Sequence, residues 1–386
     1  MTAVAVFTAT ALSAGPAAAD VPPGVYGRVA GVGSPVSHPL LDALSTLTPE
    51  PQGSWRLISS YGPTGAARIK TKPVACEFDR PTSAAAGKLA LRASEGEDVG
   101  AGPGSFDGDD VRGCVDYARA TTYPLAQPMG TGSYTYIPVG VSAVTAAVHG
   151  SGDLPLGWSV PQMQRIYKCF DGAVAGVPAT PRYLRPSRPG ALPNPTWDHW
   201  LVRMSITQVE IDLGDYPCLA VDTDLDPFTV ALPVFPLVEE NDGTALAGRL
   251  GDVMPFAVEA YVAQGNAVTI AAATGIVVTD RRGPALLSGL RLTGGPMRQP
   301  TVNGAVNVDF PFKRDVYDVV PTRRLAEQEP YTAEAFVGPD AVGCTATVTV
   351  GGTPRSLTEL FGLGRRTTRV GPLEAECGYT GLRADT

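Results

Sequence analysis

Glycine and hydroxyl side chains gather where predicted strands give way to predicted helices. One such loop runs Gly31-Val32-Gly33-Ser34, and another runs Gly62-Pro63-Thr64-Gly65. Backbone N–H groups at a helix start bind an anion without any net positive charge on the protein. In open α/β sheets this edge of the sheet also carries ligands. The sequence therefore predicts a binding site, and an anion is a ligand that such loops can hold.

Other reactive residue types lack the spacing that catalysis or metal binding needs. His38, His149 and His199 are scattered, and the chain has no G-x-S-x-G elbow, so no motif supports a secreted hydrolase. The run Asp107-Gly108-Asp109-Asp110 lacks the spaced ligands and terminal Glu of a calcium loop and indicates a solvated acidic turn. We expect no enzyme activity, no cofactor and no metal site.

The six cysteines predict disulfide bonds and an oxidising compartment. None forms a C-x-x-C pair, and only three histidines are present, which disfavours zinc. Six cysteines allow 15 connectivities. We expect neighbours along the chain to pair, because each pair then brackets one continuous segment: Cys76 with Cys114, Cys169 with Cys218, and Cys344 with Cys377.

Residues 1–19 have the pattern of the end of an export signal. An apolar stretch at 4–12 precedes Ala17-Ala18-Ala19, a small-residue cleavage site before Asp20. The positively charged start of a signal is missing, so we expect the true start upstream; a disordered Ala-rich tail is the alternative. No cysteine follows the signal, which predicts a secreted protein without a lipid anchor.

The composition limits the class of protein further. The chain has 386 residues, a formal net charge of -8 and 44% hydrophobic residues, with 44 Gly and 36 Pro in many turns. That charge disfavours nucleic-acid binding, which requires clustered Lys and Arg. No segment reaches the 18 or so apolar residues of a membrane span. The longest apolar run, 267–278, is expected to be a buried strand.

Strands alternate with helices along the chain, which predicts an α/β fold. Trp197 and Trp200, at i and i+3, are expected to be core residues of a helix. Strands are expected at 27–31, 55–61, 114–118, 134–144, 302–309 and 317–320. Helices are expected at 39–47, at 159–170 with Ser159 as N-cap, at 252–264, and starting within 78–94; residues 173–195 are expected to form an irregular loop.

These motifs, in this order, resemble a known family. The matching stretches include Ile58-Ser59-Ser60-Tyr61-Gly62-Pro63-Thr64-Gly65, Phe78-Asp79-Arg80-Pro81, Cys114-Val115-Asp116-Tyr117-Ala118-Arg119, Glu240-Asn241-Asp242-Gly243-Thr244 and Arg314-Asp315-Val316-Tyr317. Together they resemble the secreted phosphate-binding proteins of bacterial ABC transporters, in a divergent, actinobacterial-looking form. The resemblance covers about 26–321 and implies the class II periplasmic-binding-protein fold.

The resemblance implies two α/β lobes joined by two crossovers, closing on a ligand by hinge motion. Lobe I would comprise 22–142 and 267–386, the latter with a disulfide-tied extension, and lobe II would comprise 143–266. The crossovers would follow Val139 and lie near Tyr261. The implied partners are inorganic phosphate or a related oxyanion and an ABC permease or cell-surface protein, with the chain as a monomer.

The resemblance also assigns ligand contacts. Asp116 would accept the proton of hydrogen phosphate, or alternatively cap the turn after its strand. Arg119 would contact the anion or form a surface ion pair. The remaining candidates lie in anion-cradling loops of the two lobes, where Arg185 and Arg188 could equally be solvated: Ser34, Ser37, Thr64, Gly65, Arg185, Ser187 and Arg188.

Prolines stand where this family normally places N–H donors. Pro35, Pro186 and Pro189 each remove a donor from a predicted ligand loop. The alternative function is therefore a degenerate binding fold without phosphate affinity, serving as an extracellular interaction or structural module.

Overall fold

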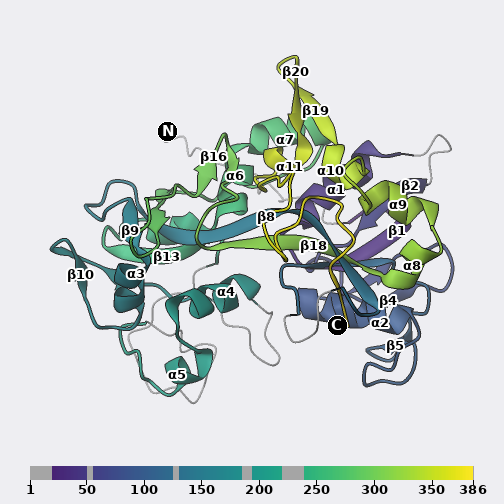
Figure 1. Cartoon of the computed structure of the whole chain (residues 1–386), viewed down its shortest axis with the longest axis horizontal. Coiled ribbons are helices and arrows are strands. Elements are labelled where there is room, and N and C mark those ends of the chain that lie inside the picture. Colours follow the sequence, from purple (N-terminus) through teal and green to yellow (C-terminus); the bar gives the residue numbers. More distant parts are fainter. Residues whose placement is uncertain (1–19, 50–54, 125–129, 185–193, 220–238, 386) are drawn as a thin grey trace, which may run out of the picture.

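The computed structural model describes residues 20–49, 55–124, 130–184, 194–219 and 239–385. Its centre is a nine-stranded mixed sheet in the order β12-β13-β8-β18-β7-β1-β2, with β14 and β21 also pairing with β8. The strands β1, β2 and β7 are parallel to one another, whereas β18 runs antiparallel to β7 and β8. Helices flank this sheet (Figure 1). The predicted α/β class is confirmed.

The N-terminal part of the chain builds a first body around the parallel strands. Its hydrophobic residues form two buried clusters, one on each side of these strands. Its elements are β1 (Tyr26–Gly33), α1 (His38–Leu47), β2 (Trp55–Ser60), β3 (Arg68–Lys70), β4 (Glu77–Asp79), α2 (Ala84–Ser94), β5 (Ser105–Phe106), β6 (Asp109–Asp110) and β7 (Tyr117–Ala120). Ser83 caps α2 by accepting a hydrogen bond from the Ala86 N–H.

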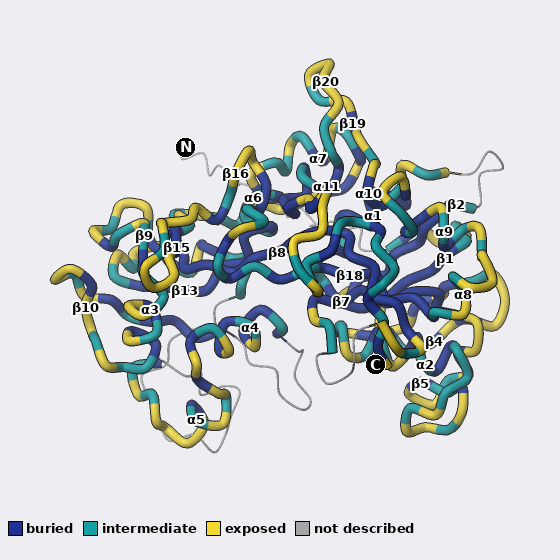
Figure 2. Tube along the Cα trace, in the orientation of Figure 1, coloured by how far each residue is buried: buried dark blue, intermediate teal, exposed yellow. Residues whose placement is uncertain are grey.

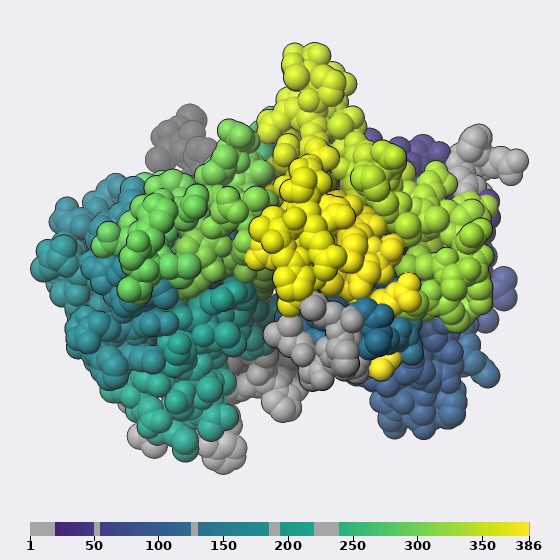
Figure 3. Space-filling model, in the orientation of Figure 1, coloured from purple at the N-terminus to yellow at the C-terminus, as the bar shows by residue number. Residues whose placement is uncertain are grey.

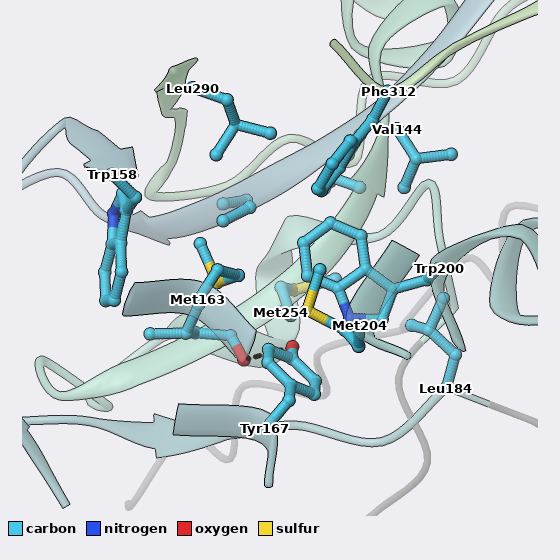
Figure 4. Close-up of a cluster of buried hydrophobic side chains, with 14 of the residues drawn as sticks. Val144, Trp158, Met163, Tyr167, Leu184, Trp200, Met204, Met254, Leu290 and Phe312 are labelled. Carbon is cyan, nitrogen blue, oxygen red and sulfur yellow. Dashed lines mark hydrogen bonds between the residues drawn. The ribbon is translucent and has the colours of Figure 1, made fainter. Parts of the chain in front are cut away.

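A second body surrounds its own core of aromatic and sulfur side chains. Trp200 packs edge-on against Tyr167 and Phe312, with ring centroids 5.2 and 5.7 Å away (Figure 4). Trp197 is also fully buried, so the predicted core role of both tryptophans is confirmed. The elements are β9 (Gly157–Ser159), α3 (Val160–Tyr167), β10 (Ala173–Val174), β11 (Val177–Pro178), β12 (Thr180–Pro181), α4 (Pro195–Met204), α5 (Gln208–Asp212), a 3₁₀ turn η2 (Gly243–Leu246), β13 (Asp252–Ala257), α6 (Val258–Gly265), β14 (Ala285–Leu287), β15 (Gly289–Arg291), β16 (Thr301–Val302) and β17 (Ala305–Val306). The helix between α6 and β14, α7 (Ala267–Thr274), packs on the first body instead.

Two long strands join the bodies. β8 (Tyr134–His149) pairs antiparallel with β18 (Lys313–Pro321), and both are buried along nearly their whole length (Figure 2). β8 carries residues of both bodies' cores, whereas β18 contributes to the two clusters of the first body and follows Phe312, a residue of the second core. The predicted lobe boundaries stay a prediction; in the structure α7 packs on the first body, whereas residues 285–312 pack on the second.

The C-terminal segment covers the strands that join the bodies. After α8 (Thr322–Ala326), α9 (Pro330–Phe336), α10 (Val342–Thr345), β19 (Thr347–Val350), β20 (Thr353–Ser356) and α11 (Leu357–Leu360), it runs beside β8 and ends at β21 (Arg383–Ala384). The Tyr136 N–H donates to the Leu382 carbonyl at 2.8 Å, and the Gly378 N–H donates to the Pro138 carbonyl at 3.0 Å. Figure 3 shows this segment over the middle of the molecule.

All three predicted disulfides are confirmed: Cys76–Cys114, Cys169–Cys218 and Cys344–Cys377. The predicted N-cap Ser159 is confirmed too, within a capping box that it forms with Gln162. No helix among the described residues is long and apolar enough to span a membrane.

Three expected elements are wrong. The run 267–278 is not a strand, because Ala favours helix and Gly275, at φ 76°, ends α7 in the left-handed conformation. The segment 252–264 is not one helix, since residues 253–257 pair with β8 before α6 begins. Burial on both faces of β13 hides the alternation that identifies a strand. The expected strand at 302–309 is the short hairpin β16–β17 instead.

The Cys344–Cys377 bond should hold the C-terminal segment on β8. Replacing both cysteines by serine should lower the free energy of unfolding by about 3 to 4 kcal/mol, because the bond spans 33 residues and its loss frees the unfolded chain. Urea unfolding measures this loss, and hydrogen exchange should quicken at the Tyr136 and Gly378 amides. The Cys169→Ser/Cys218→Ser protein is the control, since its bond lies in the second body. Unchanged exchange at both amides would contradict the expectation.

Candidate functional site

Asp116 lies directly before β7 and is 4% exposed. Its Oδ2 accepts hydrogen bonds from the Ala30 N–H at 2.7 Å and from Lys72 Nζ at 2.5 Å, and its Oδ1 accepts from Arg324 Nη1 at 2.6 Å. Both carboxylate oxygens are therefore occupied by groups of this chain. Asp116 does not cap the turn after its strand. Its contacts join the start of β7 to β1, to Lys72 and to α8.

Arg119, on β7, is fully buried among main-chain carbonyls. Its Nε donates to Ser34 O at 2.9 Å, Nη1 to Ser60 Oγ at 2.8 Å, and Nη2 to Tyr61 O at 2.5 Å. Burial lowers the pKa of Arg119. The alternative of a surface ion pair is wrong, because the guanidinium has no exposed surface. Its donors hold together the ends of β1 and β2.

The remaining predicted site residues differ in burial. Ser34 and Ser37 are buried at the start of α1, and the Ser37 hydroxyl has no hydrogen-bond partner in the described structure. Thr64 and Gly65 lie on an exposed turn after β2. Arg185, Ser187 and Arg188 lie outside the described residues. Ser34 contacts Arg119 through its carbonyl oxygen, which accepts a hydrogen bond from Arg119 Nε.

Arg80 is a buried cation that the sequence reasoning passed over. Its side chain is 3% exposed, and its Nη1 and Nη2 donate to the two carboxylate oxygens of Asp20 at 2.9 and 2.5 Å. A Cβ on Gly65, at φ +135°, would come within 2.9 Å of Arg80 Nη2. The glycine-containing turn therefore wraps closely around an arginine whose fork already holds a carboxylate.

A cavity of about 490 Å³ separates α1 of the first body from α6 and the residues after α7. Its walls are mostly apolar, with Leu40, Ala263 and Ile276 among them. Three acidic residues also line it: Asp42 from α1, Glu240 from the segment before η2, and Glu259 from α6. This size suits a small ligand.

Asp42 is the least compensated of the three acids. It is 5% exposed, and no described residue donates a hydrogen bond to its carboxylate. Burial raises its pKa to about 6, although the charges of Arg56 and Arg119 oppose the change; Asp20 adds to it. A buried carboxylate without a hydrogen-bond donor is costly, and the place of Asp42 in the cavity lining leaves its carboxylate available to a ligand.

The negative charges of Glu240 and Glu259 are partly compensated by polar or cationic neighbours. Glu240 Oε2 accepts from Asn194 Nδ2 at 3.2 Å, and Glu259 Oε1 lies 3.9 Å from Arg314 Nη2. Burial raises the pKa of both glutamates. Arg281, the cation that lines the cavity, is engaged by Asn241 at 2.7 Å. The cavity lining therefore carries an excess of acidic groups.

The sequence patterns did not identify the acidic residues of the cavity, because the sequence signal at each of these residues is local and weak. Asp42 interrupts the apolar run Leu40-Leu41-Asp42-Ala43-Leu44, and a charge inside such a run is the one sign of a buried carboxylate. Within the described residues, no three His, Cys, Asp or Glu side chains are placed to hold a metal ion. The Asp109 and Asp110 carboxylates bind Arg68 and Arg112, which agrees with the predicted acidic turn.

The comparisons find structural similarity alone. No protein-family model and no curated protein matches the sequence. An ABC-type phosphate transport receptor from Vibrio cholerae is similar with a TM-score of 0.41 and 13% identity, over 76% of this chain and 87% of that one. A putative phosphate ABC transporter substrate-binding protein with bound phosphate, from Clostridium perfringens, gives 0.39 and 11%, over 76% and 86%. Corynebacterium glutamicum OxyR gives 0.34 and 11%, over 80% and 63%. TM-scores this low say nothing about which ligand the chain binds.

Asp116→Asn should destabilise the protein. It removes the negative charge that Lys72 and Arg324 share at a largely buried position, and breaking such a pair costs about 3 kcal/mol. Urea unfolding measures the loss. Asp107→Asn, at an exposed turn, is the matched control and should leave the unfolding curve in place. An Asp116→Asn protein as stable as the parent would contradict the structural role.

Asp318 should make stability fall as pH rises. It lies on β18 opposite Arg119, is fully buried, and accepts no hydrogen bond. Burial raises its pKa to about 7, against the opposing charge of Arg119. The folded protein therefore keeps a proton that the unfolded chain releases near pH 4, so this contribution to stability is present below that pH and is lost towards pH 7.

The measurement is the unfolding free energy of the parent minus that of Asp318→Asn from pH 4 to 7. This difference should fall by up to about 1.4 kcal/mol per pH unit. Asp309→Asn, at an exposed position, is the control substitution. A difference that stays level across this range would show that Asp318 is ionised in the folded protein.

Proposed function

We propose that the protein is an exported binding protein without catalytic activity, that it holds a small ligand in the cavity between its bodies, and that phosphate is not this ligand. The observation that carries the proposal is the excess of carboxylates in the cavity, among which Asp42 accepts no hydrogen bond from the described residues. Three disulfides fit a protein that functions outside the cytosol. The proposal shares its lack of phosphate affinity with the alternative function that the sequence suggested, and it differs from that alternative by adding a small ligand in the cavity.

An oxyanion would find few free donors among the described residues that the resemblance named. Asp116 and Arg119 are each occupied by groups of the chain, and the fork of Arg80 holds Asp20. In the cavity itself, a phosphate dianion would face carboxylates between mostly apolar walls, where repulsion between like charges is stronger than in bulk water. Both arguments disfavour phosphate.

Isothermal titration with phosphate, arsenate and sulfate at pH 7.5 tests the proposal. We expect no binding heat from any of the three oxyanions. Phosphate binding that is lost in Arg185→Ala/Arg188→Ala, and kept in the control Arg291→Ala/Arg298→Ala with the same change of charge, would overturn the proposal. That result would restore phosphate capture through the loop that the resemblance named.

A further inference from the structure

The cavity between α1 and α6 combines acidic side chains with apolar walls, and this combination limits the class of ligand more than the volume of the cavity does. Asp42, a residue that is 5% exposed, lines it, and its carboxylate accepts no hydrogen bond from the described residues. Glu240 and Glu259 line the same cavity from the second body. Around these acids the walls are aliphatic, including Pro39, Leu40 and Ala260.

We propose that this cavity binds an organic ammonium ion with an apolar body, whose cationic head pairs with Asp42. The inference rests on the proposed function, since it names the ligand class of the same cavity. An ammonium group offers three donors, which an unpartnered carboxylate can accept. Pairing would also relieve the cost of burying that charge alone.

A metal ion fits these residues less well than an organic cation. The described residues place no three His, Cys, Asp or Glu side chains around one point, as a divalent cation requires. The aliphatic walls add nothing to metal coordination, whereas they would remove the carbon skeleton of an amine from water. Charge and apolar surface together thus select an amphiphilic monocation.

The charged groups around Asp42 determine how binding depends on pH. Arg56 and Arg119 favour its ionised form, whereas burial and Asp20 oppose it. His38 from the same helix, and Glu240, Glu259 and Arg281 from facing elements, line the same cavity. Because burial raises the pKa of Asp42 to about 6, ammonium binding must displace a proton at pH 5 and needs no such displacement at pH 7.5. Affinity should therefore rise between these two pH values.

Titration of the full chain with n-hexylammonium, and with 1-hexanol as the uncharged analogue, tests the inference. At pH 7.5 hexylammonium should bind at least tenfold more tightly than hexanol. Asp42→Asn should remove this preference, and Glu240→Gln, on the facing wall, should weaken it. Asp107→Asn is the matched control and should bind as the parent does. Thermal unfolding of each variant checks that it is folded.

The outcomes separate this inference from the proposed function. Equal binding of hexylammonium and hexanol, or a preference that survives Asp42→Asn, would overturn the ammonium inference while leaving a ligand cavity in place. Absence of hexylammonium binding would overturn the inference as well. The proposed function fails by a different result, namely phosphate binding in the oxyanion titration.

Discussion

β8 pairs with β18 over residues 134–143 and continues from the two hydrophobic clusters of the first body into the core of the second. Their backbone groups can be satisfied only by this pairing and by the strands and C-terminal segment beside them, because nearly all of β8 is buried. The relative position of the two bodies therefore depends on one continuous ladder of hydrogen bonds. The shape of the cavity between α1 and α6 depends on how these strands hold the two bodies, since its walls come from both bodies.

The buried charged groups differ in whether other groups of the chain form hydrogen bonds with them. In the first body, Asp116, Arg119 and Arg80 are satisfied by contacts within the chain, and these contacts bind strands to one another and to Asp20. In the cavity, Asp42 has no such satisfaction. Buried polar groups in proteins are normally hydrogen-bonded, so a carboxylate that lines a cavity and accepts no hydrogen bond from the described residues is a candidate ligand contact. The contrast separates groups that maintain the fold from groups available to a ligand.

Much of the fold could be predicted from local sequence signals. Ser159 and Gln162 form their capping box from residues three apart, and the three cysteine pairs each enclose one segment of chain. The errors arose where burial removed the alternation of polar and apolar residues: β13 resembled part of a helix, and α7 resembled a strand. For a short, uniformly apolar run, only the neighbouring elements decide between helix and strand.

The sequence by itself determined the α/β class, the disulfide pairs, the helix caps and the presence of loops suited to a ligand, because each depends on residues close together in the chain. The tertiary structure alone decided which polar groups stay free. Asp116 meets Arg324, and Arg80 meets Asp20, across long stretches of chain, and these pairings use up the groups that a phosphate site would need. Asp42, Glu240 and Glu259 come from distant segments and share one cavity only because β8 and β18 hold the two bodies together.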